Sequence, residues 1–153
     1  MDQNPESVVS LFHSHDEELG KKYIGAQGGF REWLTKGRVA ERPSYFSSED
    51  TAQHLKQFSI EKGGYGPAIN WYRAQLQNIN EADEKAIRQE AHILHRPTLL
   101  FTSHNFITVA GNPAEQMKPL VSDFTTKEIN SGHWIQREKA DEVNSILQDF
   151  FGH

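Results

Sequence analysis

The sequence has 153 residues, of which 36% are hydrophobic, and its formal net charge at pH 7 is -5. A chain of this length has room for one domain or for part of a larger one. The acidic balance, together with the lack of any block of Lys or Arg, excludes the basic surface typical of proteins that bind nucleic acid or anionic membranes. We therefore expect neither nucleic acid nor a membrane surface as a partner.

The sequence contains no cysteine, which excludes disulfides and thiolate zinc sites. The N-terminal residues are acidic and polar and lack the pattern of a signal peptide. No run of about 18 apolar residues predicts a membrane-spanning helix. Because nothing in the chain requires an oxidising compartment, the cytoplasm is the default expectation for its location.

The N-terminal part of the chain has the patterns of helices. Residues 5–26 predict a broken helix that stops at Gly20 and again at Gly25. Ser47 and Asp50 have the spacing of a capping box, which predicts a helix that begins after Ser47 and ends at the glycine pair further along.

Two further helices are predicted before the pattern changes. Pro67 suits the first turn of a helix, where its missing N–H costs nothing, and apolar residues at helical spacing continue as far as Ile79. The highly charged segment 81–92 predicts a solvated helix. We therefore assign residues 1–92 to one helical segment.

From residue 93 onward the pattern becomes that of an α/β protein, and we assign 93–153 to the C-terminal part of a parallel sheet. Two parallel strands do not make a stable sheet alone, so further strands are expected from elsewhere, or the chain is truncated. The predicted elements are a strand over 97–102, a helix over 113–121, a strand over 124–129, a loop over 130–136 and an amphipathic helix over 140–151.

Four motifs follow one another along the chain, at residues 64–73, in the strand over 97–102, at residues 131–134 and at residues 142–144. Their order resembles the epoxide hydrolases, a family of the α/β-hydrolases. Residues 64–73, which end in Asn-Trp-Tyr-Arg, resemble a cap-domain helix of that family. The strand over 97–102 is similar to the family's P-x-L-x-x-T strand. Residues 131–134 resemble the Gly-His-Trp that holds its histidine, and residues 142–144 are similar to its closing Glu-Val-Asn segment. The resemblance implies a partial α/β-hydrolase fold, with a helical cap segment followed by the last strand-helix-strand-helix units of a parallel sheet.

The resemblance also implies a reaction. In that family an aspartate attacks an epoxide carbon to form an ester, two cap tyrosines hydrogen-bond the epoxide oxygen, and a histidine activates water to hydrolyse the ester. The product is a vicinal diol and no cofactor takes part. The expected substrate is a small organic epoxide, such as a lipid or an intermediate of secondary metabolism.

Five residues match family positions or their surroundings. His133 matches the water-activating base, a role that suits an imidazole near neutral pH. Tyr72 matches a cap tyrosine that donates a hydrogen bond to the epoxide oxygen. Trp71 and Trp134 are expected in the substrate pocket. Asn105, 28 residues before His133, lies where the family has the orienting acid, and its amide carries no charge to stabilise an imidazolium.

The family's nucleophile has no match in this sequence. Neither Gly-x-Asp-x-Gly nor the His-Gly-x-Pro of the oxyanion loop occurs, so the chain is expected to be a truncated product with little activity. The alternative is a non-catalytic remnant that binds a hydrophobic ligand, forms a homo-oligomer or pairs with a full-length relative. The pairs His13-x-His15 and His92-x-x-His95 are more typical of surface histidines than of metal ligands, which need a third donor.

Overall fold

The computed structural model describes residues 1–103 and 111–152. Contacts between residues divide the chain into two compact units, Met1–Gln77 and Asn78–His153, which we call the first and second units. Each unit is described by itself. Together their elements make a mixed α/β chain, with helices in both units and a two-stranded parallel sheet in the second.

The first unit is helical throughout its described elements, as the sequence predicts. Its core contains Leu11, Tyr23 and Trp33, which are buried against one another. The indole Nε1 of Trp33 donates a hydrogen bond to the carbonyl of Ser7 at 2.8 Å, so this buried polar atom is satisfied. The elements are α1 (Pro5–Phe12), α2 (Glu17–Leu19), the π-helix η1 (Gly20–Gly25), α3 (Gly29–Thr35), α4 (Ser48–Gln57), the 3-10 helix η2 (Ile60–Lys62) and α5 (Asn70–Leu76).

Local sequence signals explain some of the helix ends in this unit. The capping box at α4 is present as predicted: the Ser47 hydroxyl accepts from the N–H of Asp50, and the Asp50 carboxylate accepts from the N–H of Ser47. The predicted stop at Gly20 is wrong, because the helical backbone continues from α2 through Gly20 into η1. The helical segment ends only at Gly25. A glycine costs a helix about 1 kcal/mol, which the packing of the buried Tyr23 offsets here.

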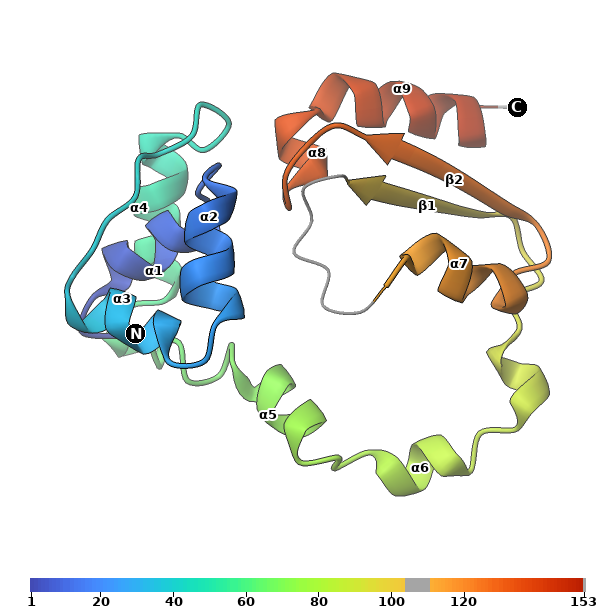
Figure 1. The fold of residues 1–153 in the computed structure, drawn as a ribbon, viewed down its shortest axis with the longest axis horizontal. Coiled ribbons are helices and arrows are strands. Elements are labelled where there is room, and N and C mark those ends of the chain that lie inside the picture. Colours follow the sequence, from blue (N-terminus) through green and yellow to red (C-terminus); the bar gives the residue numbers. More distant parts are fainter. Residues whose placement is uncertain (104–110, 153) are drawn as a thin grey trace. The chain divides into compact units, whose positions relative to one another are not determined.

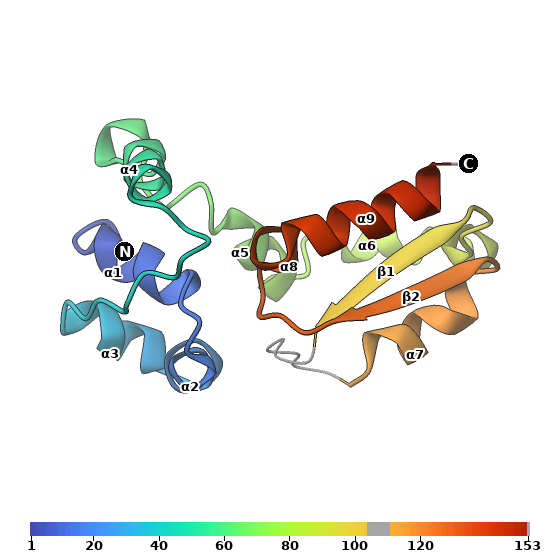
Figure 2. The same ribbon diagram turned by 90° about the horizontal axis from the view of Figure 1, so that it is seen from above.

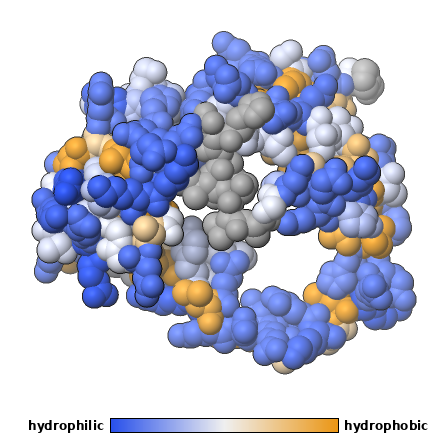
Figure 3. Space-filling view, viewed as in Figure 1, coloured by the Kyte–Doolittle hydropathy of each residue, from blue (hydrophilic) through white to orange (hydrophobic). Residues whose placement is uncertain are grey.

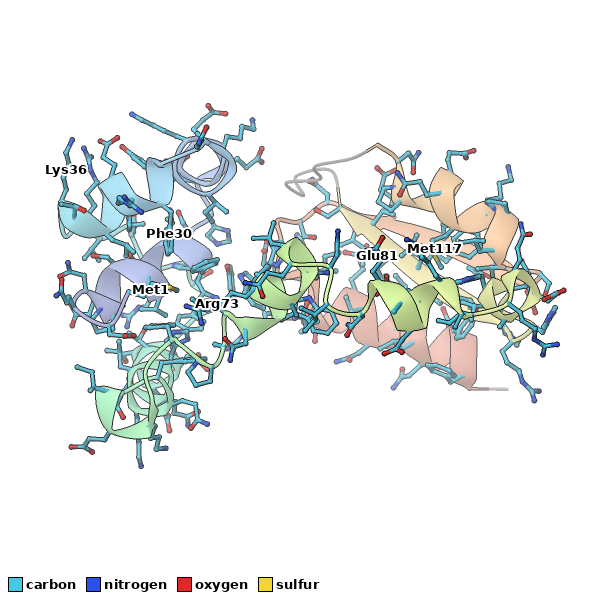
Figure 4. The ribbon with its side chains drawn as sticks, turned by 90° about the horizontal axis from the view of Figure 1, so that it is seen from below. Met1, Phe30, Lys36, Arg73, Glu81 and Met117 are labelled. Atoms are coloured by element: carbon cyan, nitrogen blue, oxygen red, sulfur yellow. The ribbon has the colours of Figure 1, made fainter. Side chains whose placement is uncertain are left out.

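The helix expected from Pro67 is shorter than predicted. Pro67 lies in turns, α5 begins only at Asn70, and Ile79 lies beyond its end. The Arg73 guanidinium reaches back along α5 to the Asn70 side chain at 2.8 Å and to the Gly66 carbonyl at 3.3 Å, and Figure 4 labels Arg73 on this helix. Tyr72, Leu76 and Ile79, at helical spacing, are exposed, so no buried face extends this helix.

The second unit contains the strands. β1 (Thr98–Ser103) and β2 (Phe124–Ile129) pair in parallel, with Thr98 opposite Phe124 and Ser103 opposite Ile129, and both predicted strands are thereby confirmed. In two perpendicular views α9 lies on one side of the pair and α7 on the other (Figures 1 and 2). The remaining elements are α6 (Glu81–Lys85), the 3-10 helix η3 (Gln89–His92), α7 (Pro113–Met117), the 3-10 helix η4 (Lys118–Leu120), α8 (Ile135–Glu138) and α9 (Ala140–Phe151).

Two predictions for this unit need correction. The charged segment 81–92 forms two short helices, α6 and η3, instead of one. Its ion pair of Lys85 with Glu81, at 2.6 Å, is exposed and adds little stability. The loop predicted over 130–136 is shorter, since α8 begins at Ile135.

The surface is mostly polar. Figure 3 shows a largely hydrophilic face with small, separate hydrophobic areas, in keeping with a mean hydropathy of -0.70. Among the described helices, none combines the length and the apolar character that crossing a membrane requires.

Candidate functional site

The loop that follows β2 carries His133. β2 ends at Ile129, which is fully buried, and Ser131 is 5% exposed. The hydroxyl of Ser103, the last residue of β1, donates a hydrogen bond to the Ser131 carbonyl. The loop is therefore fixed to the carboxyl end of the neighbouring strand, the edge where parallel α/β sheets place ligands.

A single carboxylate holds the loop on both sides of the histidine. Glu138 Oε2 accepts from the N–H of Gly132 at 2.7 Å, and Glu138 Oε1 accepts from the N–H of Trp134 at 3.0 Å. Hydrogen bonds to a charged acceptor are stronger than neutral ones. The residues before and after His133 are thus tied to the same side chain, at the C-terminal end of α8.

His133 is exposed and lines a hollow at the carboxyl ends of the two strands. The cavity volume is about 630 Å³, within the range of small-molecule sites. Side chains of a strand alternate between faces, and Leu100, Thr102, Thr126 and Glu128 share one face of the pair. We call this cavity the strand-end hollow; it is lined by those four residues together with Phe101, Ser103, Asn112, Pro113, Ala114, His133 and Ile135.

The imidazole and the neighbouring indole are arranged at right angles. The ring centroids of His133 and Trp134 are 5.0 Å apart with an interplanar angle of 90°, an edge-to-face contact. Trp134 is half-buried and is not among the residues that line the strand-end hollow. Its role as a pocket residue stays a prediction, while its contact supports the ring of His133.

The other expected site residues lie elsewhere in the chain. Trp71 and Tyr72 belong to α5 in the first unit and are 69% and 63% exposed. Their side chains are accessible to a ligand from solvent. Asn105 lies outside the described residues, so its expected contact with the imidazole stays a prediction.

The first unit has its own pair of titratable rings, a buried tyrosine and a half-buried histidine. His54 Nε2 and the Tyr65 hydroxyl are 2.9 Å apart, and the N–H of Tyr65 donates to the Asp2 carboxylate at 2.9 Å. Burial lowers the pKa of His54. Burial and the negative charge of Asp2 raise the pKa of Tyr65 to about 12. These shifts describe a packed interior, because Tyr65 is only 4% exposed.

The unit has a further hollow of about 650 Å³. Figure 4 labels two of the residues that line it, Met1 and Phe30.

Within residues 1–103 and 111–152, no three His, Cys, Asp or Glu side chains are grouped so that they could hold a metal ion. His13 is buried and its ring stacks on Phe46 at 3.8 Å, so it is not the surface residue that its sequence position predicts.

No protein-family model matches the sequence. The chain is 25% identical over 151 residues to the bifunctional epoxide hydrolase 2 of the pig, Sus scrofa, an alignment that covers 90% of this chain and 24% of that protein. The crystal structure of wild-type Cfl2 from Burkholderia cenocepacia matches 95% of this chain and 48% of its own, with a TM-score of 0.59 and 22% identity.

The comparisons indicate a distant, hydrolase-like relationship. The sequence match supports a relationship to an α/β-hydrolase, and the structural match supports the fold. The chain spans about a quarter of the length of that curated relative and about half of the solved chain.

Sequence reasoning missed one residue of this site. Glu138 follows His133 by five positions and lies between the loop predicted over 130–136 and the helix predicted over 140–151. The signal that indicates its role is the spacing between Gly132 and Glu138, since a carboxylate a few residues past a glycine can accept backbone N–H groups. Because this spacing of glycine and glutamate is common in proteins, it indicates a role for Glu138 only once the loop conformation is known.

Proposed function

We propose that the chain acts on epoxides, with His133 as the base that activates water for opening to a vicinal diol. The observation that carries the proposal is the histidine on an anchored loop at the carboxyl end of a parallel strand pair, lining a hollow of about 630 Å³. The distant relationship to an epoxide hydrolase supports the choice of substrate class.

The chemistry requires a proton acceptor beside a water molecule. In the simplest route the water oxygen attacks an epoxide carbon, a water proton passes to the imidazole of His133, and the ring C–O bond breaks. The alkoxide oxygen takes up a proton to complete the diol. Tyr72 is proposed as the donor to that oxygen, because a phenol can stabilise the developing negative charge.

Two features of the sequence should limit the rate at which this chain opens epoxides. Asn105, at the expected position of the orienting acid, has an amide that can hold an imidazole but cannot stabilise its charged form. The covalent route also needs an aspartate on a strand-to-helix turn, and the printed sequence has no such motif. The proposal therefore assigns direct water attack to this chain, and the faster ester route to a polypeptide that also contains the aspartate.

The test measures diol formation from styrene oxide, a simple aryl epoxide, by the purified chain and two variants. His133→Ala removes the base, and His95→Ala removes another exposed histidine of the second unit that lies outside the strand-end hollow. We expect the enzyme-dependent rate to fall about 100-fold or more in His133→Ala, the usual contribution of a general base, and to be unchanged in His95→Ala. Equal rates in both variants, or no diol above the buffer blank, would contradict the proposal.

A second role is favoured by the strand pair itself. The described residues form a two-stranded parallel sheet, whose outer edges have no further strand among them, and such a pair gains stability from additional strands. A non-catalytic remnant that pairs with another copy or with a full-length relative is the alternative. A monomer by light scattering at high concentration, with no ligand-induced change in melting temperature, would argue against it.

A further inference from the structure

The strongest unassigned feature is the carboxylate of Glu138. Its two oxygens accept from the N–H groups of Gly132 and Trp134, at 2.7 Å and 3.0 Å, and these residues flank His133. The N–H of Glu138 in turn donates to the carbonyl of Trp134 at 2.9 Å. The Trp134 backbone is therefore bonded to Glu138 through both its donor and its acceptor.

The opposite end of the loop is fixed independently. Ser131 is buried, its N–H donates to the Ile129 carbonyl at 2.9 Å, and its carbonyl accepts from the Ser103 hydroxyl. The backbone on the N-terminal side of His133 is thereby held to both strands. With the C-terminal side held by Glu138, the direction of the His133 Cα–Cβ bond is fixed with respect to the strand-end hollow.

The packing around Gly132 reflects the same close approach of Glu138. A Cβ atom added at this position would lie 2.9 Å from Glu138 Oε1 and 3.2 Å from Oε2, and real Cβ atoms essentially never lie closer than 3.0 Å to another heavy atom. The approach of the carboxylate therefore favours glycine here, because a larger residue would make the end of the Glu138 side chain shift. Backbone conformation is not the reason, because Gly132 is not among the residues with positive φ.

We propose that Glu138 is the positioning residue of the site, acting through the loop backbone to hold the imidazole of His133 toward the strand-end hollow. This role of Glu138 in catalysis rests on the proposed function, in which His133 is the base. Glu138 bonds the backbone on either side of the histidine, and it differs in this from an orienting acid, which bonds the imidazole itself.

The loop can be tested without any assay of activity. In Glu138→Gln the amide oxygen can still accept one N–H group, while the NH₂ group accepts none, so at least one of the two loop amides loses its acceptor. Glu138→Ala removes both acceptors. Glu142→Gln is the matched control, because it makes the same change of charge at an exposed position in the first turn of α9.

The measurement is amide hydrogen exchange of the chain by NMR, read at Gly132 and Trp134. We expect exchange to be about 10-fold faster at one of these amides in Glu138→Gln and at both in Glu138→Ala, with Glu142→Gln unchanged. Resonances of Ile129 and Val143, buried in the second unit, report whether each variant remains folded. Unchanged exchange at both amides in a folded Glu138→Ala variant would overturn the proposal.

The χ1 rotamer of His133 distinguishes a positioning role of Glu138 from a purely structural one, because only a positioning residue would change it. Three-bond couplings that report its χ1 angle should indicate one rotamer in the natural chain and in Glu142→Gln, and averaging over rotamers in Glu138→Ala. If the loop amides exchange faster while the His133 rotamer stays fixed, Glu138 stabilises the loop without positioning the base, and the proposal is wrong.

Kinetics separate this inference from the proposed function. With styrene oxide, Glu138→Gln should lower kcat about 10-fold and leave KM within about twofold, because the hollow itself is unaltered. A chain that forms no diol but has the predicted exchange and rotamer changes would refute the proposed function alone. Diol formation that is equally fast in the natural chain and in Glu138→Ala would refute the positioning role alone.

Discussion

Replacing Gly132 with alanine should have opposite effects depending on the residue at position 138. In the natural chain the new methyl group would lie 2.9 Å from Glu138 Oε1, so we expect the carboxylate to shift and to weaken or lose its two loop hydrogen bonds. Bonds to a charged group contribute about 1.5–3 kcal/mol each when buried. Since Glu138 is only half-buried and water can replace it, we expect a combined loss of about 1–2 kcal/mol.

The same substitution also has a stabilising effect through the unfolded chain. Where alanine fits the native backbone, replacing glycine stabilises a protein by about 0.4–1 kcal/mol, because the unfolded state has less freedom. The net effect of Gly132→Ala on the natural chain should therefore be a loss of about 0–1.6 kcal/mol of stability. In the Glu138→Ala background it should stabilise the chain by about 0.4–1 kcal/mol, since the clash is gone.

A double-mutant cycle in urea provides the assay. Unfolding of the second unit is followed by NMR resonances of Ile129 and Val143, so that the first unit does not contribute. The coupling energy between the two substitutions should be about 1–2 kcal/mol. If Gly132→Ala has the same effect in both backgrounds, the reasoning from the carboxylate contact is refuted.

Three further outcomes are expected. Trp33→Phe should destabilise the first unit by about 1–3 kcal/mol in a urea titration, because the buried Ser7 carbonyl loses its donor. The same change at the exposed Trp71 should cost less than about 0.5 kcal/mol. Equal costs would contradict a stabilising role for the Trp33 hydrogen bond. Ile129→Ala should lower the free energy of unfolding of the second unit by about 2–5 kcal/mol, since the side chain is fully buried; a loss below about 1 kcal/mol would disagree with that burial. Because the pKa of Tyr65 is raised to about 12, its phenol favours the folded state below the unfolded value near 10, and this stability should be lost as the pH rises from about 10 to 12. Thermal unfolding of Tyr65→Phe should lack that alkaline component, and an identical pH dependence would contradict the assignment.

Elements with a local cause were predictable from the sequence. The capping box at Ser47 and Asp50 depends on two residues three positions apart, and the structure contains both of its hydrogen bonds. The strands near 97–102 and 124–129 follow from short apolar or β-branched runs between breakers. The helix stop predicted at Gly20 is wrong because a glycine ends a helix only where packing does not offset its low helix propensity.

Features that depend on folding could not be predicted. Tyr65 meets Asp2 across 63 positions in the chain, a contact that no local pattern indicates. Glu138 is close in sequence to His133, yet its bonds exist only because the loop after β2 turns both neighbouring N–H groups toward it. The sequence therefore predicts the identity of the candidate base, while the group that holds it comes from the loop conformation.

Locating where an epoxide binds is the sharpest test of the proposed function. Styrene oxide is added to isotopically labelled chain, and the shifted NMR resonances are mapped. We predict shifts at His133 and at Thr102, Ala114 and Thr126, which line the strand-end hollow with it, and smaller shifts in His133→Ala. Shifts confined to the first unit, or no shift at saturating epoxide, would refute the proposed function.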